Sequence, residues 1–179
     1  MARRRIICTA ALVLLALAVV SFIGRRPAQA FGGEPAAHAL SAPDLFYAFS
    51  DAYVTETYPD GNYGSGSLLV VALLKGPARA ESLLRFDFYG IPPGAVISDA
   101  TLYVYHQEGS GPNPTIEVHR LTSNWTETGV TWNNRPGHSP AIYDAVAVGT
   151  VAGWISWDVT GLVQNWVNGT VNNLSLIHI

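Results

Sequence analysis

Ser123–Pro136 has the sequence S-N-W-T-E-T-G-V-T-W-N-N-R-P. Trp125 and Trp132 are separated by a polar, turn-forming run that fits neither the helical nor the strand period. We therefore expect a long, ordered connection between two sheets, fixed by tryptophans that each bury roughly 150–250 Å² when packed. The favoured interpretation is that both rings fill the core at one end of a β-sandwich. The alternative is a platform on which sugar rings stack.

The segments on either side of this connection alternate apolar and polar residues, as half-buried strands do. In Ser82–Tyr89, for example, Leu84 and Phe86 face away from Leu83 and Arg85. The predicted strands are Asp51–Thr55, Leu68–Leu74, Ser82–Tyr89, Val96–His106, Thr115–Leu121, Tyr143–Val148 and Trp154–Val159. Turn-forming residues separate them throughout.

One short helix is predicted over residues 161–167, where Leu162, Val163 and Trp166 share a face. Thr160 is the expected N-cap and Gly169 the expected left-handed residue after the helix. A single short helix among many strands is typical of an all-β protein. We therefore predict an antiparallel two-layer β-sandwich.

The first 30 residues have the features of a secretory signal peptide. Three arginines precede the apolar run Ile6–Ile23, and Ala28-Gln29-Ala30 resembles a cleavage site. An uncleaved membrane anchor is the alternative, because the apolar run is long enough to span a bilayer. Residues 31–45 are rich in Ala, Gly and Pro and are predicted to be a linker. We expect a secreted or cell-surface protein.

Removal of residues 1–30 would leave five basic residues against 13 acidic ones, a net charge of −8. Such a surface repels polyanions, which argues against nucleic acid and mildly against strongly anionic polysaccharides. The only cysteine, Cys8, lies in the signal segment, so the processed chain would contain no disulfide. After signal cleavage we expect no membrane partner.

The sequence shows no catalytic pattern. It contains neither a G-x-S-x-G nor an H-E-x-x-H motif, and its histidines are scattered. Asp60-Gly61-Asn62 resembles part of a calcium loop, but a glycine-rich turn is the favoured interpretation. We expect no enzymatic activity, no cofactor and no metal.

Arg85 lies in the middle of a predicted strand, opposite Leu84 and Phe86, so its face is expected to be at least partly covered. A covered guanidinium needs a carboxylate or several carbonyls, and Asp87 and Asp158 are the predicted partners. The favoured role is a structural ion pair. The alternative is a clamp for a carboxylate of the ligand.

Tyr103 and Tyr105 lie on the same face of the predicted strand Val96–His106 as Thr101. If that face is open, the two tyrosines form an aromatic strip able to pack on sugar rings. The alternative is that a second sheet covers them. The candidate ligand-binding residues are Tyr103, Tyr105, Arg85 and Trp125, and the residues predicted to be structural are Trp132, Asp87, Asp158 and Trp166.

Seven motifs occur in an order found in one known family. They are D-A-Y-V (51–54), N-Y-G-S (62–65), L-L-R-F-D (83–87), I-P-P-G-A-V-I-S-D-A-T-L (91–102), W-T-E-T-G-V-T-W-N-N-R-P (125–136), W-D-V-T (157–160) and L-V-Q-N-W-V-N-G (162–169). Over about Phe46–Asn173 the chain resembles the DNRLRE-type domain, carbohydrate-binding module family 96. The resemblance implies a secreted, non-catalytic, jelly-roll-like β-sandwich that binds a polysaccharide. Such domains occur beside polysaccharide-degrading enzymes or in surface proteins, so a covalently linked catalytic or surface domain is an expected partner.

Some relatives bind alginate, which suits a net charge of −8 poorly. The alternative function is a structural or adhesive extracellular domain without affinity for sugar. The family continues beyond Asn173 with further strands, whereas this chain ends L-S-L-I-H-I. Those residues match a translated transposon end used in preparing sequencing libraries. We therefore expect residues 174–179 to be a sequencing artefact and the domain, residues 46–173, to be truncated.

Overall fold

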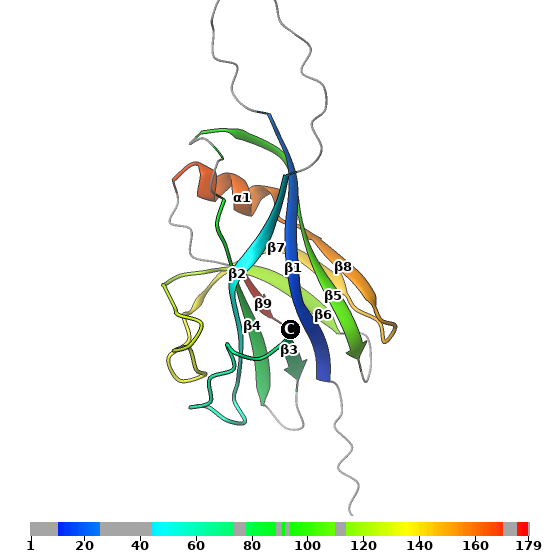
Figure 1. Cartoon of the computed structure of the whole chain (residues 1–179), viewed down its shortest axis with the longest axis vertical. Coiled ribbons are helices and arrows are strands. Elements are labelled where there is room, and N and C mark those ends of the chain that lie inside the picture. The colour runs from blue at the N-terminus through cyan, green and yellow to red at the C-terminus, as the bar shows by residue number, and fades with distance from the viewer. Residues whose placement is uncertain are drawn as a thin grey trace, which may run out of the picture.

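The strands and helix predicted from the sequence are present in the computed structural model of the chain, which describes residues 11–25, 44–73, 78–88, 91, 94–109, 114–169 and 175–178 (Figure 1). The elements are β1 (Ala11–Arg25), β2 (Asp44–Thr55), β3 (Leu68–Leu73), β4 (Arg79–Phe86), β5 (Val96–Gly109), β6 (Thr115–Leu121), β7 (His138–Ala147), β8 (Gly153–Asp158), α1 (Thr160–Val167) and β9 (Ser175–His178). The prediction of an all-β protein with one short helix is confirmed for these residues.

All the strand pairs are antiparallel, and they follow the path β7-β6-β9-β4-β2-β1-β5-β8, with β3 paired to both β1 and β4. The path folds back on itself, so that β8 lies opposite β6. The buried indole Nε1 of Trp157 on β8 donates a hydrogen bond to the Ile116 carbonyl oxygen on β6 over 3.0 Å. At the two ends of the path, the Asp158 N–H donates to Asp144 Oδ2 on β7 over 2.8 Å. The two predicted layers are thus the halves of one curled sheet.

The main core fills the space between the two halves. It takes one face of each strand, as the alternation predicts: Leu84 and Phe86 on β4, and Leu102 and Val104 on β5, are all buried. Other members of this core are Leu69, Val71, Ile116, Val118, Trp157, Val159, Leu162, Val163 and Trp166. Each Å² of apolar surface that this core removes from water contributes about 25 cal/mol to stability. Because the chain has a single cysteine, burial of this core is its main stabilising contribution.

A second core lies on the outer face of β4, β2 and β6, beneath the tryptophan connection. Its members are Ala52, Val54, Leu83, Leu121, Trp125 and Val130, with Trp132 packed against it. We expected this connection to close one end of the sandwich, and that predicted position was wrong. The segment lies across the outside of a sheet, because the odd-numbered face of β4 carries Leu83 and needs cover from water.

The helix α1 lies across one end of the strands (Figure 1). The side chain of Gln164 attaches it to the start of β5, accepting a hydrogen bond from the Ile97 N–H over 2.8 Å and donating one to the Ala95 carbonyl oxygen over 3.0 Å. Leu162, Val163 and Trp166 face the main core, as predicted.

The ends of α1 differ in how well the sequence predicted them. Thr160 is the first helical residue and not the cap: Val159 holds the N-cap position, without a side-chain cap. The Thr160 hydroxyl instead accepts a hydrogen bond from the Ala100 N–H over 2.9 Å, because β5 offers an unpaired donor at that point. Gly169 has φ +89°, which confirms the predicted left-handed residue after the helix.

Two strands fall in segments that we predicted to lie outside the domain. β1 pairs with both β2 and β5 and so occupies the middle of the path, and β9 pairs with β4 and β6. The structure is that of the unprocessed chain as it is encoded. Cleavage of residues 1–30, the linker over residues 31–45 and an artefactual origin of residues 174–179 stay predictions.

Candidate functional site

The outward face of β2 and β5 carries tyrosines in register with one another. Tyr47 on β2 and Tyr103 on β5 both pair with Val19 of β1, so their side chains leave the sheet on the same side. Tyr47 is 59% exposed and Tyr103 36% exposed. Their strands are two steps apart, about 9.5 Å at the usual strand spacing.

The next strand extends this face. Tyr105 on β5 is directly opposite Trp154 on β8 in the ladder. The two rings meet edge to face, with centroids 5.4 Å apart and planes at 79°. Trp154 remains 54% exposed. Such a contact fixes the orientation of both rings while leaving the indole open to solvent.

We call the residues Tyr47, Tyr103, Tyr105 and Trp154 the aromatic face. Leu45 and Phe49, both more than half exposed, extend it along β2. Exposed apolar side chains gathered on one face of a sheet mark an interaction site more often than scattered single residues do. Tyr103 and Tyr105 were predicted from the alternation along one strand, whereas Tyr47 and Trp154 are placed beside them only by the strand register.

Arg85 lies on the outer side of β4 and is half-buried. Its Nη2 donates to the Trp125 carbonyl oxygen over 2.7 Å, and its guanidinium carbon lies 5.2 Å from the Trp125 ring and 5.7 Å from the Phe49 ring. Burial lowers the pKa of Arg85 from its ordinary value, yet the group stays charged at neutral pH. Its contacts are a carbonyl and two aromatic faces.

The predicted ion pairs of Arg85 with Asp87 and Asp158 are not formed among the described residues. Asp87 follows the end of β4 and is exposed. Asp158 lies on β8, in the other half of the sheet, and accepts a hydrogen bond from the Thr160 N–H over 2.9 Å. Hydrogen bonds from Thr160 hold the pKa of Asp158 below its ordinary value.

Trp125 is 6% exposed and packs in the second core. Its indole Nε1 is buried and has no hydrogen-bond partner among the residues the structure describes. A ring so placed serves as apolar filling, in line with the favoured interpretation of the tryptophan connection. It presents no face on which a sugar could stack.

Trp132 is half-buried and covered by a neighbouring arginine. The guanidinium carbon of Arg135 lies 3.5 Å from the centre of its ring, and Arg135 Nη1 donates to the Trp132 carbonyl oxygen over 2.7 Å. Arg135 Nε also donates to Glu81 Oε2 over 3.0 Å, and Glu81 is 5% exposed. The buried ion pair expected at Arg85 is thus found at Arg135, which sequence reasoning missed because the two partners are far apart in the chain.

Trp166 is 8% exposed and belongs to the main core, where its ring stacks on Phe88 with centroids 5.5 Å apart. This position agrees with the structural role that we expected for it.

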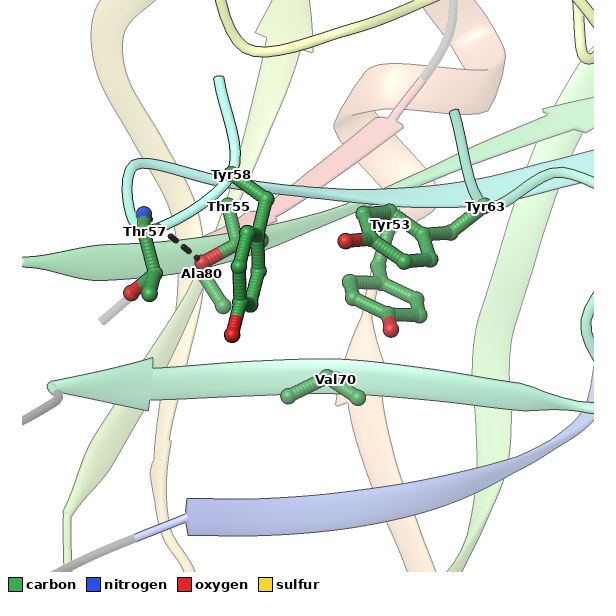
Figure 2. A pocket seen from close by; sticks show the side chains of 7 residues that line it. All are labelled: Tyr53, Thr55, Thr57, Tyr58, Tyr63, Val70 and Ala80. Carbon is green, nitrogen blue, oxygen red and sulfur yellow. Dashed lines mark hydrogen bonds between the residues drawn. The ribbon is translucent and has the colours of Figure 1, made fainter. Parts of the chain in front are cut away.

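A pocket that sequence reasoning missed lies at the end of β2, opposite β3. Figure 2 shows its lining residues: Tyr53, Thr55, Thr57, Tyr58, Tyr63, Val70 and Ala80. The rings of Tyr53 and Tyr63 stack, with centroids 4.3 Å apart and planes at 16°. We call this the tyrosine pocket. Part of this pocket could be recognised in the sequence, because Tyr58 and Tyr63 border the turn Pro59–Asn62. Tyr53, which stacks on Tyr63, looked like an ordinary strand residue.

Within the described residues, no group of three or more His, Cys, Asp or Glu residues is placed to hold a metal ion. None of the helices in the same residues is long and apolar enough to cross a membrane.

Residues 43–178 match the family description of carbohydrate-binding module family 96. The chain belongs to carbohydrate-binding module family 96. The match begins next to β2 and ends with β9, so it spans nearly all of the curled sheet except β1. No curated protein matches the sequence. Among the described residues, the aromatic face and the tyrosine pocket both combine exposed aromatic rings with hydroxyl groups.

Proposed function

We propose that this family 96 module is a secreted, non-catalytic domain that binds a polysaccharide along the aromatic face. The observation that carries the proposal is the Tyr105–Trp154 pair, in which a fixed indole remains 54% exposed on an open sheet. Membership of a carbohydrate-binding family supports the same class of ligand.

The chemistry of the aromatic face suits a sugar polymer. The C–H face of a pyranose ring is apolar and packs on an aromatic ring, while tyrosine hydroxyls can exchange hydrogen bonds with sugar hydroxyls. In the unprocessed chain, where β1 separates their strands, Tyr47 and Tyr103 stand about 9.5 Å apart. Tyr103, Tyr105 and Trp154 lie on the neighbouring strands β5 and β8, outside the leader that export would remove, so a polymer that follows these two strands meets aromatic side chains at successive positions.

Charge favours a neutral polymer. Removal of residues 1–30 would leave a net charge of −8, and Arg85, which lies against Phe49 at one end of this face, already donates to the Trp125 carbonyl oxygen. An anionic chain such as alginate would be repelled at low ionic strength. We therefore expect stronger retention on neutral polysaccharides than on polyuronates.

Secretion rests on the leader sequence. The arginines, the apolar run and Ala28-Gln29-Ala30 together have the order of an export signal. N-terminal sequencing of the protein recovered from the medium tests this point, and Phe31 is the expected first residue.

The decisive experiment is retention of the full chain on insoluble cellulose, xylan, mannan and chitin. We expect retention on at least one polymer and its loss in Trp154→Ala and Tyr105→Ala. Val151→Ala is the matched control, because Val151 is 83% exposed but lies outside the aromatic face. Failure of the unaltered chain to bind any of these polymers would favour a structural or adhesive domain.

A further inference from the structure

The tyrosine pocket is a hollow of about 320 Å³ between β2 and β3. Figure 2 shows the Tyr58 ring standing apart from the stacked Tyr53 and Tyr63 rings, with Val70 of β3 facing the gap between them. Tyr58 is 64% exposed. The pocket thus offers one exposed ring, one stacked pair and an apolar floor.

The loop that forms this pocket is attached to the tryptophan connection on one side through Asn62. The Asn62 side-chain nitrogen donates to the carbonyl oxygens of Glu127, over 2.8 Å, and Val130, over 2.7 Å. Gly64 packs directly on the same segment: a Cβ added there would lie 2.1 Å from the Glu127 carbonyl oxygen. The position therefore requires glycine.

A second attachment involves Asn133. Its side-chain nitrogen donates to Asp60 Oδ1 over 2.7 Å, and its backbone N–H donates to the Pro59 carbonyl oxygen over 3.1 Å. Both attachments come from the tryptophan connection, which thus holds the pocket loop in one conformation. A site that is already formed costs less conformational entropy when a ligand binds.

The pocket also presents unused hydrogen-bonding groups. Within the part of the chain that the structure describes, the hydroxyls of Tyr53, Tyr58 and Tyr63 make no hydrogen bond to protein. Hydroxyl groups beside aromatic rings are the combination that a sugar satisfies, since it has both apolar C–H faces and many hydroxyls.

We propose that the tyrosine pocket binds a single neutral sugar residue, as a second carbohydrate site formed by residues other than those of the aromatic face. The proposal rests on the proposed function in that both sites take carbohydrate. The pocket lies near the lower limit of size for ligand sites, which suits one sugar ring better than a long chain.

The lining of the pocket favours a neutral sugar over an acidic one. It consists of tyrosine, threonine, valine and alanine side chains and contains no charged group. The carboxylate of a uronic acid would therefore lose hydration in the pocket without gaining a basic partner among the lining residues.

The test is a titration of the full chain, labelled with carbon-13 in its tyrosine rings, with cellotriose, mannotriose, xylotriose and laminaritriose. Trigalacturonate is the charged comparison. We expect at least one neutral trisaccharide to shift the signals of Tyr53, Tyr58 and Tyr63 in a saturable manner. Tyr58→Ala should raise the dissociation constant about tenfold or more, and Tyr53→Phe, which keeps the ring and removes the hydroxyl, about threefold or more.

The controls separate the two sites. Trp154→Ala should leave the trisaccharide titration at the pocket unchanged, and Tyr58→Ala should still be retained on insoluble polymer through the aromatic face. If no neutral trisaccharide moves the three tyrosine signals, or if only trigalacturonate does, the pocket proposal is overturned. Failure of the aromatic face alone would appear as retention that is unaffected by Trp154→Ala.

Discussion

The guanidinium of Arg85 donates a hydrogen bond to the main-chain carbonyl oxygen of Trp125 over 2.7 Å. Forty residues separate the two positions, so this contact attaches the tryptophan connection to the middle of β4. The cation also lies against the rings of Trp125 and Phe49, which compensate in part for its lost hydration.

We expect Arg85→Met to destabilise the domain by about 1–3 kcal/mol, because the Trp125 carbonyl oxygen loses its partner and the ring loses the cation. Urea unfolding followed by tryptophan fluorescence measures this. Arg79→Met is the control, since the Arg79 side chain is exposed. An unchanged unfolding midpoint combined with lost polysaccharide retention would instead support the ligand-clamp alternative for Arg85.

Trp125→Ala should cost about 3–5 kcal/mol of unfolding free energy, the usual range for removing a buried large aromatic side chain. Trp132→Ala should cost less, because Trp132 is only half-buried and part of its contact is with Arg135. Calorimetric melting of the two variants gives the comparison. Equal costs would mean that the second core does not depend on Trp125.

Gly64→Ala should destabilise the pocket loop by about 1–3 kcal/mol, since the new methyl group would overlap the Glu127 backbone and the backbone must shift. Gly149→Ala is the matched control, because a Cβ at Gly149 meets nothing within 4 Å. Urea unfolding tests the stability, and hydrogen exchange of the Gly129 and Val130 amides tests the local effect. A neutral Gly64→Ala would show that the loop is not pressed against the tryptophan connection.

Asp51→Asn should raise the melting temperature more at about pH 7 than at about pH 3. Burial first, and Glu127 second, raise the pKa of Asp51 above 3.8. The folded state therefore favours the neutral carboxyl, and stability that is fully present below the ordinary pKa is lost as the pH rises through the folded pKa. Asparagine stays neutral and avoids this loss. A benefit that is the same at both pH values would contradict the assignment.

Asp158→Asn should behave in the opposite way. Hydrogen bonds from Thr160 lower the pKa of Asp158, so its contribution is present above the ordinary value of 3.8 and is lost as the pH falls through the folded pKa. The variant should lower the melting temperature at about pH 7 and have little effect at about pH 2. Melting curves of both aspartate variants in the same buffers provide the measurement.

The alternation of residues was enough to predict most of the sheet. Leu84 and Phe86 were assigned to one face of their strand, and both lie in the main core. These assignments depend only on the two-residue period of a strand and on the need to bury apolar side chains. The helix followed from the same reasoning with a different period, although the role of Thr160 did not.

The partners of charged side chains could not be predicted. Arg85 was expected to pair with a carboxylate, yet it bonds to a carbonyl, while the buried ion pair joins Arg135 to Glu81. Such pairs depend on which loop covers which face of a sheet. A local pattern contains no information about that choice.

The candidate sites also contain some residues that the local pattern predicts and others that only the strand register or a loop brings together. Tyr103 and Tyr105 were visible as an alternating pair on one strand, whereas Tyr47 and Trp154 join them only through the register of β2 and β8. The tyrosine pocket was missed because Tyr53 and Tyr63 stack across a loop. The sequence alone does not show how that loop returns to β2.

The hydrogen bond from Trp157 to the Ile116 carbonyl oxygen has a mechanical consequence. Trp157 lies on β8 three residues from Trp154, so a polymer that is bound to Trp154 and under tension would exert force on this strand. Inside a dry core such a bond is stronger than in water, and it transmits part of the load to β6 in the opposite half of the sheet. The shear would then be shared between both halves instead of peeling β8 from its neighbour.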